Sequence, residues 1–369
     1  MTIRPMEPDE RKQTMRCARR SFGDLHVLFI SLNGQVFIAE QEGAILGGIV
    51  LTQFTLGDES CGMVKWLFTD PDAQGQGVAG GLVAQGMEWF AEHQCTTVFT
   101  CIEGFNTASQ NRFRNEGFSP VSFQWQLRHF GFNLPRVWWH ASHGLDIGHM
   151  LWVWRSQDRP SSSDSVEPAR SVISAWIGMA ILNTLLFTFM LVRNHGVPAI
   201  SATEVLYLLL AVTVVFGLRT LSMRVTAAVV DIPVVFQNWE AGFSLSALVT
   251  IGFGGIVPVP GSWYPRSEYW RYQALIPKLG PVAAAGTGDV LILGWVLFYL
   301  TGLVDPTTPL HQLLSITGSI ARVLLVYDVL LPFFPMGCFN GKRIFDWQPL
   351  IWGVMAVATV GLIWMHTLG

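Results

Sequence analysis

Charged residues are scarce in this chain. Asp, Glu, Lys and Arg make up 13% of the 369 residues, against about 25% in ordinary soluble proteins. More than half of these charges lie in the first 160 residues, and long apolar runs fill the remainder. This imbalance predicts a soluble domain followed by a membrane domain. The net charge of −3 lacks the basic excess typical of nucleic-acid-binding proteins, so no nucleic-acid partner is expected.

The sequence also lacks CxxC pairs and an apolar run at its start. The chain has five scattered cysteines without a CxxC pair, which predicts reduced thiols in a cytosolic compartment. The first 20 residues are polar and charged, so we expect no cleaved signal peptide.

A glycine-rich stretch, Gln74–Gly80, follows an apolar run with β character at 63–69 and precedes an amphipathic helix predicted at 82–90. It has no Lys-Ser/Thr pair and is therefore not a Walker loop. Its GxGxxG spacing lacks the acidic residue that a Rossmann fold places about 20 residues later at a strand end. A glycine turn before a helix N-terminus nevertheless predicts a phosphate-binding cradle of backbone amides.

The soluble part alternates strand and helix patterns and predicts a mixed α/β fold. Hairpin and helix-stop signals fall at Glu42-Gly43-Ala44 and at Gly117. Strands are expected at 2–6, 35–41, 45–54, 62–69, 96–102 and 119–128, and helices at 7–22, 82–90 and 106–115.

The loop Gln74-x-x-Gly77-x-Ala79 resembles the Gln/Arg-x-x-Gly-x-Gly/Ala loop of the GNAT superfamily of acyl-CoA-dependent acyltransferases. Thr2-Ile3-Arg4-Pro5, the Glu42–Gly48 hairpin, and Asn106 followed by Phe113 and Gly117-Phe118 are similar to other GNAT segments. The resemblance covers about residues 1 to 130. It implies a mixed, mostly antiparallel sheet with helices, and acetyl-CoA or another acyl-CoA as the cofactor. The cofactor-binding residues that it implies are Gln74, Gly75, Gln76, Gly77, Val78, Ala79, Gly80, Asn106 and Phe113.

Two features depart from the family's pattern. Many members carry a Glu general base on the strand before the loop, where this chain has Lys65. The tyrosine that commonly protonates the thiolate is Phe113 here. Such proton transfer contributes about 10²–10⁴-fold, although positioning alone also accelerates transfer to a neutral amine. Glu103 is the candidate substitute base, and the alternative is a solvated loop carboxylate.

The span 129–155 is rich in tryptophan and contains His140, His143 and His149. A metal site would need converging ligands, and no acidic partner is fixed nearby. We therefore favour an amphipathic segment lying against the membrane interface.

The domain boundaries follow from composition. We expect a GNAT-like acyl-CoA-binding domain with its aromatic extension at 1–155, a linker at 156–170, and a membrane domain at 171–369. Spans are expected at about 172–192, 204–230, 280–303, 312–335 and 348–367, with a re-entrant segment at 243–258. The distribution of Arg and Lys predicts a multi-pass protein with a cytoplasmic N-terminal domain.

The membrane half resembles the site-2 protease fold. The resemblance rests on the segments 236–243, 333–343 and 346–349. In that family a His-Glu-x-x-His helix and the Asp of a Leu-Asp-Gly motif bind zinc, and the corresponding residues here are Leu218, Ser222 and Asn340. Because zinc hydrolysis needs three ligands and a water, we expect no zinc and no active metalloprotease.

Several charged residues lie in or beside the apolar spans. They face a partner or a re-used cavity, or the arginines snorkel at the interface; these residues are Arg219, Arg224, Asp231, Asp289 and Asp328.

Two functions from different classes remain open. The first is a membrane-tethered N-acetyltransferase whose protease-like half binds a membrane protein or peptide. The alternative is a non-catalytic membrane adaptor or assembly factor in which both halves are pseudoenzymes. The acyl acceptor is not specified by the sequence.

Overall fold

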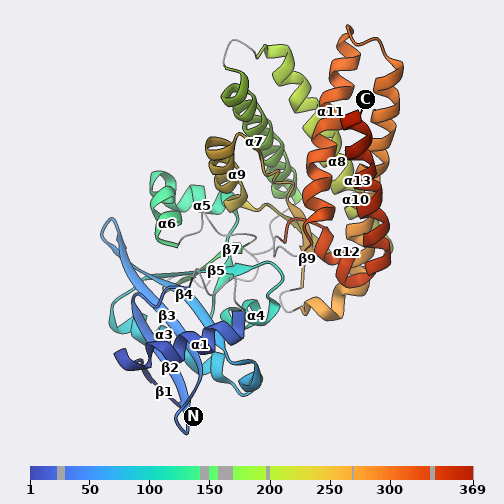
Figure 1. Cartoon of the computed structure of the whole chain (residues 1–369). Helices are drawn as coiled ribbons and strands as arrows, with labels where there is room; N and C mark the ends of the chain where they lie inside the picture. The colour runs from blue at the N-terminus through green and yellow to red at the C-terminus, as the bar shows by residue number, and fades with distance from the viewer. Residues whose placement is uncertain are drawn as a thin grey trace. The chain divides into compact units, whose positions relative to one another are not determined.

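The computed structural model describes residues 1–22, 30–141, 149–156, 169–196, 200–267, 270–332 and 337–368. Its contacts divide the chain into two compact units. The first comprises Met1–Ile102, Ala108–His143 and Met150–Ser165, and the second comprises Glu103–Thr107, Gly144–His149 and Val166–Gly369. Figure 1 colours both along the chain, and each unit is described by itself.

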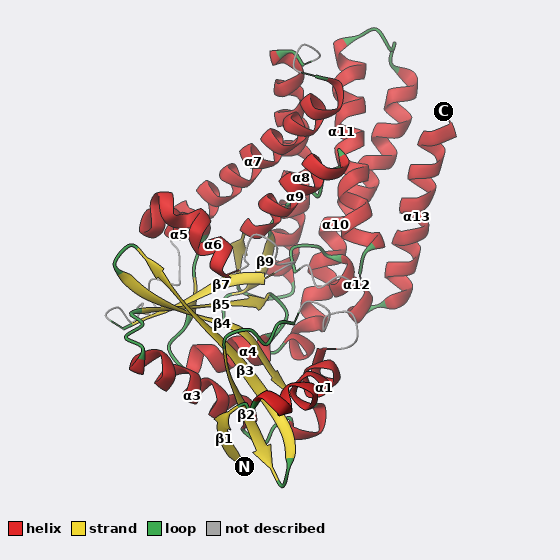
Figure 2. Ribbon diagram, turned by 60° about the vertical axis from the view of Figure 1, so that its left-hand side comes forward, coloured by secondary structure: helices red, strands yellow, loops and turns green. Residues whose placement is uncertain are grey.

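The first unit is built on a seven-stranded sheet of order β1-β2-β3-β4-β5-β7-β6, drawn in yellow in Figure 2. The pairs β1–β2, β2–β3, β3–β4 and β6–β7 are antiparallel, and β4–β5 is parallel. The predicted mixed, mostly antiparallel fold is therefore confirmed. The strands are Thr2–Pro5, Gln35–Gln41, Ala44–Leu56, Glu59–Thr69, Thr97–Glu103, Ser119–Pro120 and His149–Arg155, numbered β1 to β7.

Helices cover both faces of this sheet because successive strand residues point to opposite sides. In β2, Val36 and Ile38 pack in one cluster with Cys17 and Ala18 of α1 (Arg11–Phe22). Their neighbours Phe37 and Ala39 pack in another cluster, with residues of α3 (Val78–Glu92). The alternation of the strand thus places α1 and α3 on opposite faces.

One predicted strand is wrong. Instead of a strand over 119–128, β6 ends at Pro120 and the helix α5 covers Phe123–Phe130. Ser122 caps this helix and accepts a hydrogen bond from the amide of Trp125 at 3.2 Å. This local side-chain bond supports a helix start that the apolar pattern alone does not reveal.

The prediction for 129–155 is wrong in its last part. After the short helix α6 (Leu134–Ala141), the segment returns to the sheet as β7. Trp152 is 1% exposed and lies in the same core cluster as α3. Its indole therefore stabilises the core of the first unit and does not lie at a membrane interface.

The second unit contains, among the described residues, five helices long and apolar enough to cross a membrane, as predicted. They include α7 (Ala169–His195), α8 (Ala202–Val229), α10 (Tyr272–Leu303), α11 (Pro309–Leu325, continued by the π-turn η6 at Val326–Leu330) and α13 (Pro349–Leu368). The remaining elements are α9 (Glu240–Phe253), α12 (Gly341–Trp347) and the hairpin of β8 (Val234–Gln237) with β9 (Ser262–Pro265). With 14 residues, α9 is too short to span a bilayer.

Candidate functional site

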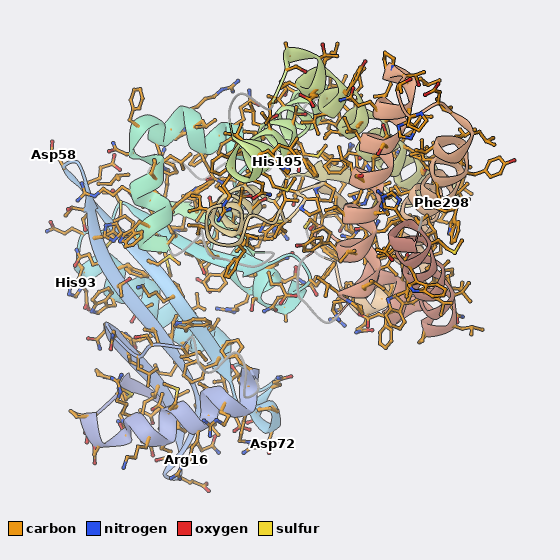
Figure 3. All side chains as sticks on the ribbon, turned by 45° about the horizontal axis from the view of Figure 1, so that its top comes forward. Arg16, Asp58, Asp72, His93, His195 and Phe298 are labelled. Atoms are coloured by element: carbon orange, nitrogen blue, oxygen red, sulfur yellow. The ribbon has the colours of Figure 1, made fainter. Side chains whose placement is uncertain are left out.

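The glycine-rich loop is entered through a fixed turn. Strand β4 ends at Thr69, and the 3-10 turn η2 covers Pro71–Ala73. The Asp70 carboxylate accepts a hydrogen bond from the amide of Asp72 at 3.1 Å. Arg20 of α1 forms ion pairs with Asp70 at 3.1 Å and with Asp72 at 2.6 Å, and Figure 3 labels Asp72. The start of the loop is therefore tied to α1.

Two glycines then turn the chain into α3. Gly75 and Gly77 both have φ of +81°, a region that costs other L-residues about 1–2 kcal/mol. A Cβ added at either position would meet no described atom within 4 Å, so the space beside them is open to a ligand.

The first amides of α3 are available to that space. Gly81 donates to the carbonyl of Gly77 at 3.0 Å, and the amides of Val78, Ala79 and Gly80 precede this first intrahelical bond. The N-cap Gly77 has no side chain to cap them. Unpaired amides at the positive end of a helix dipole form an anion site, so the structure brings together the loop residues that the sequence predicts.

Gly80 makes a contact of another kind. The Arg112 guanidinium donates to the Gly80 carbonyl at 3.0 Å, and a Cβ on Gly80 would lie 2.9 Å from Arg112 Nη1. Arg112 also forms an ion pair with Glu116. This cation beside the first turn of α3 was not predicted, because Arg112 and Gly80 are 32 residues apart in the sequence.

Strands β4 and β5 pair over only part of their length. Their parallel register runs from Cys61–Thr97 to Val64–Thr100, although β4 continues to Thr69 and β5 to Glu103. Lys65 is skipped in the β3–β4 register, where Val50 pairs with Trp66 and Leu51 with Val64. Such a bulge bends the strand locally, and it falls where the recorded pairing of β4 with β5 ends.

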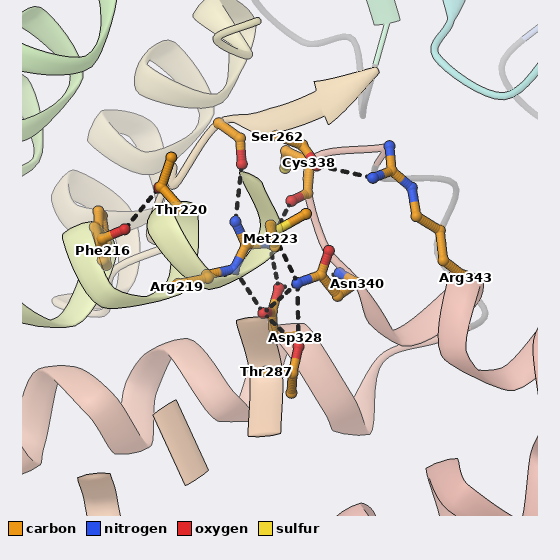
Figure 4. A network of polar contacts seen from close by, with 11 residues as sticks. Phe216, Arg219, Thr220, Met223, Ser262, Thr287, Asp328, Cys338, Asn340 and Arg343 are labelled. Carbon is orange, nitrogen blue, oxygen red and sulfur yellow. Dashed lines mark hydrogen bonds and ion pairs between the residues drawn. The ribbon is translucent and has the colours of Figure 1, made fainter. Parts of the chain in front are cut away.

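A buried polar network in the second unit includes Asn340, the residue that the site-2 protease resemblance places at the zinc-binding Asp (Figure 4). Arg219 of α8 and Asp328 of η6 form a bidentate ion pair at 2.7 and 2.9 Å, with side chains 1% and 0% exposed. Arg219 also donates to the carbonyls of Gly261 at 3.0 Å and Cys338 at 2.8 Å.

Asp328 is equally well supplied with donors. The Thr287 hydroxyl donates to it at 3.0 Å, and Asn340 donates through its backbone amide at 3.1 Å and its side-chain amide at 3.2 Å. Among the described residues, no group of three or more His, Cys, Asp or Glu side chains could hold a metal ion. What the arrangement does is join α8, α10, η6 and the start of α12 through one buried polar network.

Comparison with protein families identifies the N-terminal part of the chain. The model of the Acetyltransferase (GNAT) family matches residues 5–118. These residues form a GNAT domain. The match runs from Pro5, the last residue of β1, to Phe118, the residue before β6, and includes the glycine-rich loop.

Solved structures and one curated relative add distant similarities. The ribosomal-protein-S18-alanine N-acetyltransferase from Escherichia coli is 14% identical, covering 42% of this chain and 92% of its own, with a TM-score of 0.31. N-acetylglutamate synthase from Neisseria gonorrhoeae, solved with coenzyme A and N-acetyl-glutamate, is 19% identical over 42% of this chain and 35% of its own, with a TM-score of 0.31.

The C-terminal part is similar to a protein of Methanocaldococcus jannaschii that is named as a candidate zinc metalloprotease. The two are 27% identical over 126 residues, which is 34% of this chain and 62% of the relative. The match thus spans less than two thirds of that relative. Together with the five apolar helices, it supports a protease-like membrane domain in the second unit.

Two further residues implied by the GNAT resemblance lie in or beside α4 (Thr107–Asn115). The amide of Asn106 donates to the carbonyl of Glu103 at 3.0 Å, just before the helix. Phe113 is 2% exposed in the core of the GNAT domain, edge-on to Phe118 at 5.1 Å between ring centroids. Their roles in binding a cofactor stay predictions.

Glu103 ends β5, and its contacts group it with the second unit. Burial raises the pKa of its carboxyl group to about 7, against the opposing effect of the Lys342 cation. An ordinary Glu titrates near 4.3, and a fully solvated loop carboxylate would remain there. A carboxyl group that titrates near 7 has the proton affinity suited to a general base at neutral pH.

The predicted histidine group is only partly described. The His140 ring stacks on Phe54 with centroids 4.4 Å apart, and burial, aided by the cations Arg136 and Lys65, lowers its pKa. His143 and the side chain of His149 lie outside the described residues.

Proposed function

We propose that this chain is a membrane-anchored N-acyltransferase that binds acetyl-CoA, or another acyl-CoA, and acylates an amine. The observation that carries the proposal is the open anion site made by Gly75, Gly77 and the first amides of α3. The match of residues 5–118 to the acetyltransferase family supports it.

The residues present fit the diphosphate of an acyl-CoA. The amides of Gly75 and of Gly77 to Gly80 would hold it, because two glycines leave room for close approach and the helix dipole favours negative charge. The amides of Gln74 and Gln76 already donate to the carbonyls of Pro71 and Ala73. When bound, the cofactor supplies an activated acyl thioester. Glu103 would accept the proton of the attacking amine, because a primary amine is mostly protonated at pH 7.

The pH dependence of turnover tests this role of Glu103. At saturating acceptor, kcat should rise about tenfold per pH unit below pH 7 and level off above it, because the carboxylate form, which accepts the proton, accumulates as pH rises through about 7. Glu103→Gln should remove this inflection and lower the plateau about 100-fold or more.

The matched control is Glu88→Gln, which neutralises an exposed carboxylate on α3 and should leave the profile unchanged. Release of CoA thiol from acetyl-CoA, measured with amine acceptors from pH 5.5 to 9, gives the readout. An unchanged profile in Glu103→Gln would show that Glu103 is not the base.

We further propose that the membrane half performs no metal-dependent proteolysis and instead binds a membrane protein or peptide, with the GNAT domain on the cytoplasmic side. Leu218, Ser222 and Asn340 stand at the ligand positions, and the Asn340 side chain already donates to Asp328 and Thr287. The basic residues before the first span support the orientation.

Metal analysis provides the corresponding prediction. Protein purified in detergent without chelator should carry less than about 0.1 zinc per chain, because hydrolytic zinc sites need three protein ligands. A stoichiometric zinc ion that resists dialysis would overturn this part of the proposal.

The second candidate function is a non-catalytic adaptor that binds acyl-CoA. Lys65 and Phe113 favour it, because neither can take the usual GNAT proton-transfer roles. The pH experiment separates the two: saturable acetyl-CoA binding without turnover for any amine acceptor at any pH favours the adaptor.

A further inference from the structure

A half-buried carboxylate lies within the longest apolar helix. Asp289 belongs to α10, inside the candidate span Tyr272–Leu303. It follows Lys278 by 11 residues, or about 16 Å along a helix. Exposed Lys278 donates to the carbonyl of Asp231 at 2.8 Å, at the end of the neighbouring helix. With Lys278 near one interface, Asp289 lies in the interior of a hydrocarbon layer about 30 Å thick.

The side chains around Asp289 face outward and are apolar. On the same side of α10, Ile292 is 63% and Val296 is 46% exposed. On α8, which packs along α10 (Figures 1 and 2), Leu221 is 62% and Val225 is 55% exposed. We call this surface the α8/α10 face: Leu221, Ser222, Val225, Asp289, Ile292 and Val296.

Asp289 is less well supplied with donors than the other intramembrane carboxylate. In the described part of the chain, its recorded hydrogen bond comes from the Ser222 hydroxyl. Asp328, by contrast, is fully buried and receives donors from Arg219, Thr287 and Asn340. A carboxylate can accept about four hydrogen bonds, so Asp289 has capacity left for a donor from outside the unit.

A carboxylate with spare acceptor capacity, surrounded by exposed apolar side chains, specifies the chemistry of a ligand. A charge within a bilayer is costly unless a partner neutralises it, and the apolar residues around Asp289 suit the side chains of another helix. A second copy of this chain docked symmetrically on the same face would bring Asp289 against Asp289. Like charges in a low-dielectric medium repel, so the face favours a basic partner over a copy of itself.

We propose that the α8/α10 face binds a transmembrane helix of another protein that presents a Lys or Arg at the depth of Asp289. The inference rests on the proposed function, in which the membrane half binds a membrane partner, and it names the partner's chemistry. The Lys or Arg donates to Asp289, and the apolar side chains of the face pack against the rest of the helix.

A synthetic transmembrane helix tests this directly. The full-length protein, labelled with a fluorescent donor, is placed in lipid vesicles with an acceptor-labelled polyleucine helix that carries one central Lys. This helix should bind about three- to thirtyfold more tightly than an all-leucine helix, the range expected for interhelical polar contacts in membranes. Asp289→Asn should reduce its affinity to that of the all-leucine helix.

Asp231→Asn is the matched control. It makes the same change at the end of α8, at a residue with φ of +51° that asparagine tolerates, and it should leave binding of the Lys helix unchanged. Equal binding of the Lys and all-leucine helices to the wild type would overturn the proposal. So would full binding of the Lys helix by Asp289→Asn, or self-association of the chain that requires Asp289.

Acetyl-CoA binding is measured in the same vesicles. Asp289→Asn should retain it, which also shows that the variant is folded. If Asp289→Asn loses binding of the Lys helix but still binds acetyl-CoA, the loss is specific to the α8/α10 face. If the wild type does not bind acetyl-CoA, that result counts against the proposed function. If Asp289→Asn does not fold, the affinities of the wild type for the Lys helix and for the all-leucine helix still test the proposal.

Discussion

Gly77→Glu is expected to lower the affinity for acetyl-CoA by at least about 100-fold. Gly77 has φ of +81° and is the N-cap of α3, so a glutamate there strains the backbone by about 1–2 kcal/mol. Its carboxylate would also enter the space that a diphosphate needs and would compete for the same amides. Calorimetry with the full-length protein in detergent measures the affinity.

Gly43→Glu is the control that distinguishes damage to the anion site from the general effect of backbone strain. Gly43 has φ of +80°, and an added Cβ there also meets no described atom within 4 Å, but it lies in the turn between β2 and β3. This variant should bind acetyl-CoA like the wild type. Wild-type affinity in Gly77→Glu, or an equal loss in both variants, would contradict the assignment of the site.

Asp328→Ala is expected to destabilise the membrane half by about 3–5 kcal/mol, because it leaves the Arg219 guanidinium buried without a counter-charge. Thr287 and Asn340 would lose an acceptor as well. Replacing both charges, in Arg219→Leu/Asp328→Leu, should recover much of the loss, since well-packed apolar residues often replace a buried ion pair at little cost. Unfolding in mixed micelles with increasing SDS measures the difference.

Asp305→Ala provides the comparison for a surface carboxylate. Asp305 is exposed and accepts hydrogen bonds from Thr307 before α11, so its loss should destabilise the protein far less than the loss of Asp328. If Asp328→Ala were no more destabilising than Asp305→Ala, the buried pair would not hold the membrane half together.

The features predicted correctly from the sequence are those that depend on local order. The glycine loop needs only a strand, a turn with two residues in left-handed conformation, and a helix, which follow one another directly along the chain. The membrane helices follow from the length and hydropathy of each segment. Both kinds of signal lie within one stretch of chain. The strand, glycine turn and helix and the five apolar helices are as predicted, whereas binding of a cofactor by the loop stays a prediction.

Features that depend on distant residues were missed. Arg112 reaches Gly80 across 32 residues and Asp328 reaches Arg219 across 109, so the sequence shows the charges but not their partners. The predicted strand over 119–128 failed for a different reason. Its apolar residues also fit a short helix, and a single hydrogen bond from the Trp125 amide to the Ser122 hydroxyl favours that helix.

Amide hydrogen exchange on the full-length protein, with and without acetyl-CoA, tests the central claim most directly. The account predicts that a saturating ligand slows exchange of the amides of Val78, Ala79 and Gly80, which precede the first intrahelical bond of α3. The turn at Gly43 should exchange at the same rate in both samples. Unchanged exchange at Val78–Gly80 in a sample that binds acetyl-CoA would show that the ligand lies elsewhere, and would contradict the account.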